Sequence, residues 1–143
     1  AACDMAVAVD SANFCLSEVK IGLVPATIAP YVLRAMGPRA GHRYFLTAER
    51  FDAAAALRMG FVHEVVPADE LDNAVDALLK HLLQAGPDAL KACKKLVLDV
   101  AEREINEQLS RDTVERIADI RASDEGKEGV QAFLGKRKPS WLS

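Results

Sequence analysis

The chain offers far more helix-forming sequence than strand-forming sequence. Only three short segments, residues 5–9, 13–16 and 61–66, have the apolar or aromatic character of strands. A sheet usually contains about four to six strands. Three segments cannot complete a parallel sheet, so we expect further sheet-forming residues upstream of Ala1, where the chain begins without Met.

Helix stops and caps divide the first half of the chain. Gly37, which is followed by proline, separates two helices predicted over residues 28–36 and 39–46. Asp52 precedes an alanine-rich stretch, 53–59, and is expected to cap it. A carboxylate at this position accepts a hydrogen bond from a free N–H group of the first turn. The first half therefore combines short strands with short helices.

The second half is predicted to be helical throughout. One helix begins at Ala68 or Asp69 and ends before Gly86, Pro87 starts the next, and Ser123 caps a last one. Helical spacing places four sets of residues on single faces: Leu71, Val75, Leu78, Leu79 and Leu82; Leu90, Cys93, Val97 and Val100; Ile105, Leu109, Thr113, Ile117 and Ile120; Val130, Phe133 and Leu134. These faces are expected to be buried. Together these faces carry more apolar surface than the predicted strands can cover. We therefore expect the helices to pack against a missing half of the protein or against another subunit.

Composition predicts a soluble globular chain. Its 143 residues are 50% hydrophobic, enough for one domain with a core. A formal charge of −3 gives no general electrostatic reason to bind nucleic acid or an anionic membrane. No apolar stretch reaches the ~18 residues of a spanning helix and no secretory leader opens the chain, so a cytoplasmic location is expected.

The cysteines and histidines suggest no metal site. Cys3, Cys15 and Cys93 are odd in number and form no CxxC pair, which argues against a disulfide framework or zinc. They are expected to be small core residues. The three histidines are also far apart in the sequence.

Glu18 is the strongest candidate for a catalytic group. It is a lone carboxylate among apolar residues, with Gly22 and Pro25 behind it. Partial burial raises the pKa of a carboxyl group toward the range in which it both gives and takes a proton. The simpler alternative is a solvated or helix-start charge.

Three separated segments then point to a family: FCLSEVKIGLVP at residues 14–25, FLTA to ALRMGFV at 45–62, and EGVQAFLGKRKP at 128–139. In order and spacing they resemble the enoyl-CoA hydratase/isomerase (crotonase) family from the middle of its catalytic domain to its C-terminus. The resemblance implies an α/β fold, the C-terminal portion of a crotonase (ClpP-like) spiral, over residues 1–66. A helical trimerisation region over 67–143 follows.

The resemblance also implies a chemistry. Glu18 matches the second of two glutamates that hold a water between them in hydratases, and the first glutamate and the oxyanion hole lie upstream of the position matching Ala1. The implied reaction is hydration of a 2-enoyl-CoA thioester to a 3-hydroxyacyl-CoA, a lyase activity of fatty acid or leucine catabolism. The CoA belongs to the substrate, and no separate cofactor or metal is implied.

Residues near the C-terminus are implied to bind CoA. In the family, residues matching Phe133 and Lys136 reach the CoA of a neighbouring subunit in a homo-trimer or a dimer of trimers, the ring against the nucleotide and the lysine toward phosphate. A cation beside a polyphosphate is physically sensible. The alternative for residues 136–138 is a solvated basic tail.

One stretch departs from the family pattern. Typical members have a glycine-rich run after Pro25, whose amides approach the substrate, whereas here Ala26 is followed by Thr27 and Ile28. Ala26 still offers an amide, but the larger side chains narrow the space. This variant resembles a bacterial subgroup acting on glutaconyl-type acyl-CoAs, such as 3-methylglutaconyl-CoA or its isohexenyl relative.

Two other functions remain open. The same scaffold with one working carboxylate performs double-bond isomerisation of an enoyl-CoA, and Glu18 alone does not separate this from hydration. Outside the enzymes, the chain by itself is a candidate assembly or binding fragment, because the oxyanion hole and partner glutamate are missing.

Overall fold

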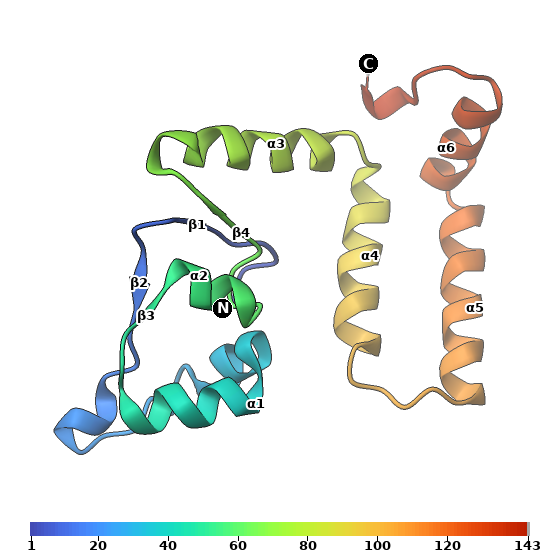
Figure 1. The fold of residues 1–143 in the computed structure, drawn as a ribbon. Helices are drawn as coiled ribbons and strands as arrows, with labels where there is room; N and C mark the ends of the chain where they lie inside the picture. Colours follow the sequence, from blue (N-terminus) through green and yellow to red (C-terminus); the bar gives the residue numbers. More distant parts are fainter. Residues whose placement is uncertain (143) are drawn as a thin grey trace. The chain divides into compact units, whose positions relative to one another are not determined.

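A computed structural model describes residues 1–142, which form two compact units, Ala1–Ala77 and a second unit from Leu78 onward (Figure 1). The division falls inside helix α3 (Leu71–Leu83). The assignment of residues 1–66 to a catalytic core and 67–143 to a trimerisation region remains a prediction, since it concerns the roles of the segments. No helix within residues 1–142 is both long and apolar enough to span a membrane.

The first unit pairs its four short strands in twos. Its elements before α3 are β1 (Val7–Val9), β2 (Asn13–Phe14), the 3-10 helix η1 (Glu18–Ile21), α1 (Ala29–Thr47), β3 (Phe51–Asp52), α2 (Ala53–Arg58), β4 (Glu64–Val66) and the 3-10 helix η2 (Ala68–Glu70). β1 runs parallel to β4, with Val7 opposite Glu64, and β2 runs antiparallel to β3, with Phe14 opposite Phe51. The three predicted strands are confirmed but are shorter than expected. β3 is too short to show any periodicity in the sequence.

Helix α1 changes direction at Gly37. This residue has φ 77° and ψ 159°, a left-handed conformation that interrupts the helix before Pro38 restarts it. An added Cβ at Gly37 meets no atom within 4 Å, so the backbone angle rather than crowding favours glycine. The predicted stop between two helices is confirmed as this kink inside one longer element.

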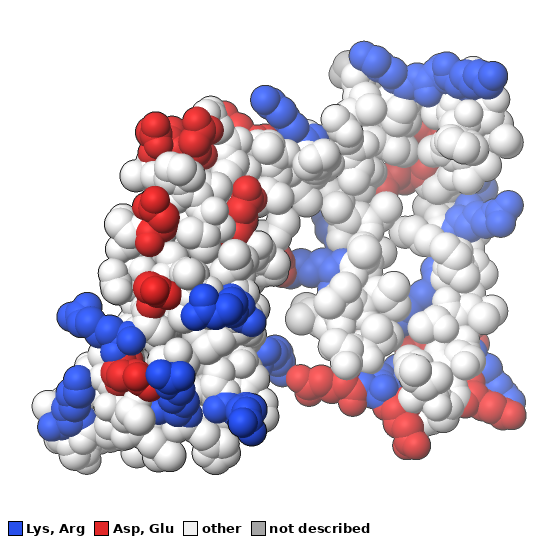
Figure 2. Space-filling view, viewed as in Figure 1, with Lys and Arg blue, Asp and Glu red and all other residues white. Residues whose placement is uncertain are grey.

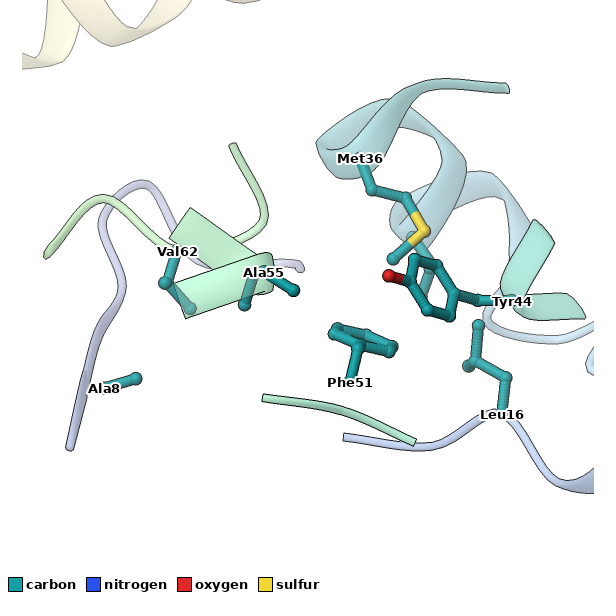
Figure 3. Packing of buried hydrophobic residues seen from close by; sticks show 9 residues of the cluster. Ala8, Leu16, Met36, Tyr44, Phe51, Ala55 and Val62 are labelled. Atoms are coloured by element: carbon teal, nitrogen blue, oxygen red, sulfur yellow. The ribbon is translucent and has the colours of Figure 1, made fainter. Parts of the chain in front are cut away.

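Phe51 lies at the centre of the first unit's core (Figure 3). Its ring centroid lies 4.4 Å from that of Tyr44 on α1 and 5.3 Å from that of Phe14 on β2. Phe61 meets the Phe51 ring edge-on at 6.0 Å. Leu16, just before η1, is buried in the same cluster. The core therefore holds α1, both strands of the β2–β3 pair and the entry to η1 together.

The second unit consists of helices with side-chain caps. After α3 come α4 (Pro87–Val100), α5 (Glu107–Ala122), α6 (Asp124–Leu134) and the 3-10 helix η3 (Ser140–Leu142). Ser123 caps α6 as predicted, accepting from the Gly126 N–H at 3.0 Å. The Glu125 carboxylate of α6 accepts from the N–H groups of Asp88 and Ala89 at the start of α4. The Glu125 carboxylate thereby connects α6 to α4. A Cβ atom at Gly86 would collide with this carboxylate.

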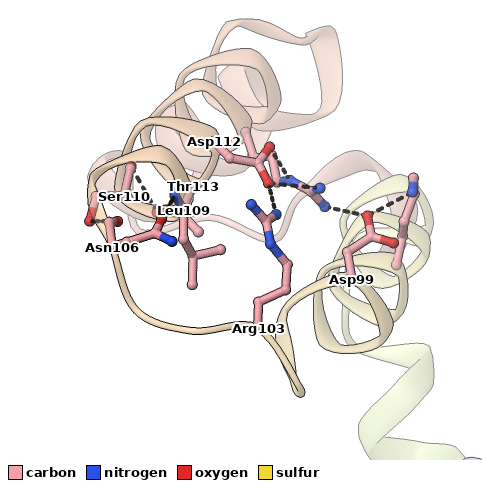
Figure 4. A network of polar contacts seen from close by, with 9 residues as sticks. Asp99, Arg103, Asn106, Leu109, Ser110, Asp112 and Thr113 are labelled. Atoms are coloured by element: carbon pink, nitrogen blue, oxygen red, sulfur yellow. Dashed lines mark hydrogen bonds and ion pairs between the residues drawn. The ribbon is translucent and has the colours of Figure 1, made fainter.

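Asp99 of α4 and Asp112 of α5 belong to one polar network (Figure 4), in which Arg116 of α5 reaches Asp99 of the other helix and Asp112 of its own. Its guanidinium donates to Asp99 at 2.7 Å and to Asp112 at 3.1 Å, while Lys95 and Arg103 complete the pairs. Hydrogen bonds from Lys95 and Arg116 lower the pKa of Asp99, and those from Arg116 and Arg103 lower the pKa of Asp112. The network orients α5 against α4, with each carboxylate meeting two cations.

The helical faces of the second unit are less buried than the sequence predicts. No residue of α4 is buried within residues 1–142, and Val97 and Ile117 are both exposed. The expectation that the three cysteines are core residues is also wrong, since all of them are exposed. Helical periodicity identifies a shared face but not the element that covers it. Packing of these faces against further chain or another subunit stays a prediction.

Asp52 provides a test of local helix capping. Its Oδ1 accepts from the Ala55 N–H at 2.7 Å at the start of α2, as predicted. Asp52→Ala should lower the free energy of unfolding by about 1 kcal/mol, because it leaves that N–H without a partner. Asp52→Ser restores an acceptor and should recover most of the loss in denaturant titration. Equal stability of the alanine variant and the unchanged protein would contradict this role.

Candidate active site

Glu18 is the first residue of η1, directly behind a segment fixed by the core. Leu16 is buried, and the Cys15 thiol donates to the Ala48 carbonyl oxygen at 3.4 Å. Gly22 ends η1 at φ 75°, a conformation that side chains other than glycine's rarely tolerate. The Leu23 N–H closes the turn on the Glu18 carbonyl oxygen at 3.0 Å. Glu18 therefore sits on a short turn held at both ends.

The Glu18 carboxylate has one buried oxygen without a hydrogen-bond partner. Oε2 is inaccessible to solvent and accepts no hydrogen bond within residues 1–142. Leaving a buried polar atom unpaired costs about 1–3 kcal/mol, so such atoms are rare in folded proteins. They occur where a group must remain available for a proton, a water or a ligand. This environment fits the acid/base role better than that of a solvated charge.

The turn itself carries exposed apolar side chains. Ile21 is 75% exposed, and Leu23 and Val24 are exposed as well. Three exposed apolar residues within four positions of the chain are unusual unless they meet a ligand or another chain. The turn thus combines a carboxylate with an apolar surface.

Ala26 follows on the same loop, but its amide is already engaged. Its N–H donates to the Val24 carbonyl oxygen at 2.8 Å. A substrate group that met this amide would compete with that bond. Pro25 beside it is buried, whereas Thr27 and Ile28 are exposed. Contact between Ala26 and a substrate remains a prediction.

Phe133 and Lys136 lie together at the end of α6, in the second unit. The Phe133 ring is 83% exposed. Lys136 has φ 51°, and its N–H donates to the Phe133 carbonyl oxygen while that of Arg137 donates to the Ala132 carbonyl oxygen. This is the Schellman pattern that ends many helices, usually with glycine in the left-handed position. A lysine there costs about 1 kcal/mol, so a side-chain role would explain its presence.

Glu128 fastens the segment after Lys136. Both of its oxygens accept from the Arg137 guanidinium, at 2.6 and 2.8 Å, and the Ser140 N–H donates at 2.9 Å. These bonds, chiefly that from Arg137, lower the pKa of Glu128 to about 2. The Trp141 indole N–H donates to the Gln84 carbonyl oxygen, which closes the turn. Local sequence patterns do not reveal this role of Glu128, because its partners lie nine or more residues away.

His63 has a structural role that spacing alone does not reveal. The backbone N–H of Ala6 donates to Nδ1 of the His63 ring at 3.1 Å. The backbone N–H of His63 donates to the Ala6 carbonyl oxygen at 2.8 Å. These bonds extend the pairing of β1 with β4. Among residues 1–142, no three His, Cys, Asp or Glu side chains are grouped to hold a metal ion.

Comparisons with known proteins identify the family. Residues 1–143 match the enoyl-CoA hydratase/isomerase family. The chain belongs to this family. It is 37% identical to the enoyl-CoA hydratase ACTT6 of Alternaria alternata over 97% of this chain and 47% of that relative. It is 31% identical to the carnitinyl-CoA dehydratase of Citrobacter koseri over 98% of this chain and 55% of that relative.

Comparison with solved structures supports the fold predicted from the sequence. The crystal structure of an enoyl-CoA hydratase from Shewanella pealeana superposes with a TM-score of 0.91 at 48% identity, covering 96% of this chain and 51% of that chain. The predicted crotonase fold, in its C-terminal portion, is thereby confirmed. The chain spans about half the length of the curated relatives it matches.

The structure places the four predicted site residues on two separate segments. Glu18 and Ala26 share the loop between β2 and α1, and Phe133 and Lys136 share the end of α6. The first pair belongs to one unit and the second pair to the other. Their roles remain predictions.

The lowered pKa of Glu128 predicts a pH-dependent release of the C-terminal turn. A carboxylate with a depressed pKa stabilises the folded state fully above its ordinary value of 4.5, and this contribution is lost as the pH falls toward about 2. The Trp141 indole N–H resonance should therefore shift over this window in an NMR titration. Glu128→Gln should show the released signal already at neutral pH. A resonance that stays in place from pH 5 to about 2 would contradict the anchor.

Proposed function

We propose that the complete protein containing this chain hydrates a 2-enoyl-CoA thioester to a 3-hydroxyacyl-CoA, with Glu18 as an acid/base group. The observation that carries this proposal is the buried, unpartnered Oε2 of Glu18 on a turn held by Leu16 and Gly22. Membership of a family of enoyl-CoA hydratases and isomerases supports the reaction class.

The chemistry requires what this turn offers. Water must be oriented toward the β-carbon, and a proton must reach the α-carbon. A carboxyl group held by a short rigid turn has little orientational freedom to lose when the substrate binds. The oxygen atom without a partner is available to accept a hydrogen bond from the attacking water. Negative charge that builds on the thioester oxygen needs donors from outside this chain.

For the acyl group we propose a glutaconyl-type chain. The support is the sequence after Pro25, where Thr27 and Ile28 replace the small residues typical of the family, and both side chains are exposed on the loop behind Glu18. Larger side chains at this point favour a short or branched acyl group over a long straight one. The apolar surface of Ile21 and Leu23 would contact its carbon atoms.

For the CoA we propose binding by the end of α6 in a homo-trimer or dimer of trimers. The exposed Phe133 ring suits stacking on a nucleotide base. Lys136, whose backbone is left-handed, offers the charge of its ammonium group from the same turn. Exposed apolar residues on α4 and α5 support burial by a neighbouring chain. The substrate carries the CoA, so we propose no separate cofactor, and we place the protein in the cytoplasm.

Replacement of Glu18 tests the acid/base role. Glu18→Gln in the complete protein should lower the turnover of a 2-enoyl-CoA by about 10²- to 10⁴-fold, because the amide neither gives nor takes the proton. Loss of the thioester's conjugated absorbance measures the rate. Glu64→Gln removes an exposed carboxylate of the same unit and is the matched control. Near-normal hydration by Glu18→Gln, with the oligomer intact, would refute the proposal.

Replacement of Lys136 separates its charge from its backbone conformation. Lys136→Gly removes the cation and relieves the left-handed backbone, so stability should not fall. The KM for the acyl-CoA should rise about tenfold with kcat nearly unchanged, since the lost contact is with CoA and not with the reacting atoms. Lys138→Gly removes a neighbouring charge and serves as control. An equal effect of the two variants would support the solvated-tail alternative.

A further inference from the structure

The first unit contains a hollow of about 950 Å³ between the second half of α1 and the end of α2. Arg39, His42 and Arg43 line it from α1, and Arg58 lines it from α2. On a helix, residues three and four positions apart share one face. Helix α1 kinks at Gly37, just before Arg39. The part of the helix before the kink and the part after it therefore run in different directions. Four basic or titratable side chains therefore converge on one concave surface.

Charge at this surface contrasts with the rest of the chain. Residues 29–60 contain five arginines and two acidic residues, although the whole chain has a formal charge of −3. In Figure 2, Lys and Arg side chains gather over the part of the first unit that contains α1 and α2. A local concentration of one sign raises the concentration of oppositely charged ligands nearby.

Only one of the three arginines in the hollow has a carboxylate partner. Arg43 donates to both oxygens of Glu49, at 2.5 and 3.1 Å, and its guanidinium lies 5.3 Å from the centre of the Tyr44 ring. Within residues 1–142, neither Arg39 nor Arg58 forms an ion pair or a side-chain hydrogen bond. The two unpaired guanidinium groups, one from each helix, bring like charges to the same hollow and repel one another. An anion placed between these side chains would remove that repulsion.

The wall of the hollow is apolar beneath the charges. Met36 and Tyr44 are buried at its base, and Met59 is partly exposed beside Arg58. The volume exceeds what a single phosphate group occupies and lies within the range of small-molecule sites. Guanidinium groups bind phosphate oxygens in pairs, whereas sulfur and aromatic atoms contact an organic portion.

We propose that this hollow binds a small molecule through a phosphate or pyrophosphate group held by Arg39 and Arg58. His42 supplies a further donor, and Arg43, whose charge is paired with Glu49, borders the site. The inference goes beyond the hydration of an enoyl-CoA. It rests on residues that have no part in the role proposed for Glu18, so either proposal can fail without the other.

Calorimetric titration of the complete protein with inorganic pyrophosphate and with ADP tests the site. Both should bind saturably at low salt, and more weakly as salt screens the exposed arginines. Arg39→Gln and Arg58→Gln should each weaken pyrophosphate binding about tenfold, since each removes a charge-assisted contact. Arg50→Gln is the matched control, because it removes an exposed arginine of the same unit that does not line the hollow.

The two probes distinguish the source of the phosphate. Tighter binding of ADP, lost in Arg39→Gln and Arg58→Gln, assigns the hollow to a phosphorylated organic molecule, whereas equal binding of both probes assigns it to the anion alone. The proposal is overturned if neither probe binds saturably up to about 10 mM, or if Arg50→Gln weakens binding as much as the other two variants. Turnover of an enoyl-CoA should be unchanged in all three variants.

Discussion

The packing of aromatic rings around Phe51 is the constraint on which the first unit depends. Its ring lies against Tyr44 and Phe14, which come from α1 and β2 respectively. The strands β2 and β3 contribute little regular structure of their own, since each contains two residues. Burial of the rings, not the strand hydrogen bonds, therefore supplies most of the free energy that holds them. Leu16 joins the same core, so the position of Glu18 follows from this packing.

The second unit is held by a different kind of interaction. Few of its residues are buried, and its helices are joined by charged side chains that reach from one element to the next. Arg116 links α5 to α4, Glu125 caps α4 from α6, and Glu128 holds the turn after α6. Exposed ion pairs contribute little stability individually, but here they set geometry. These ion pairs and hydrogen bonds hold the end of α6, where Phe133 is exposed.

The two candidate binding surfaces of the first unit obey opposite physical rules. At Glu18, burial leaves one carboxylate oxygen without a hydrogen-bond partner, which suits the proposed proton transfer. In the hollow between α1 and α2, repulsion between unpaired arginines would be relieved by an anion. Both surfaces depend on a left-handed glycine, Gly22 after η1 and Gly37 within α1, that redirects the chain just beside them. Local backbone geometry thus positions the side chains of each candidate surface.

The sequence by itself determined most of the helices, the caps at Asp52 and Ser123, and the choice of Glu18 as the candidate catalytic group. Asp52 and Ser123 are recognisable because capping acts within three residues, and Gly37 because a glycine before proline stops a helix wherever it occurs. Motif order was enough to predict the family. These features are local, or are preserved in the order of the chain.

Only the tertiary structure decided which faces are buried and which charges meet. Periodicity predicts burial for Val97 and for Cys93, yet both are exposed, because burial requires a second element that the pattern does not name. Glu128 pairs with Arg137 from beyond its own helix, and Arg39 and Arg58 line one hollow although they come from different helices. Long-range contacts of this kind arise when the chain folds, and no local rule encodes them.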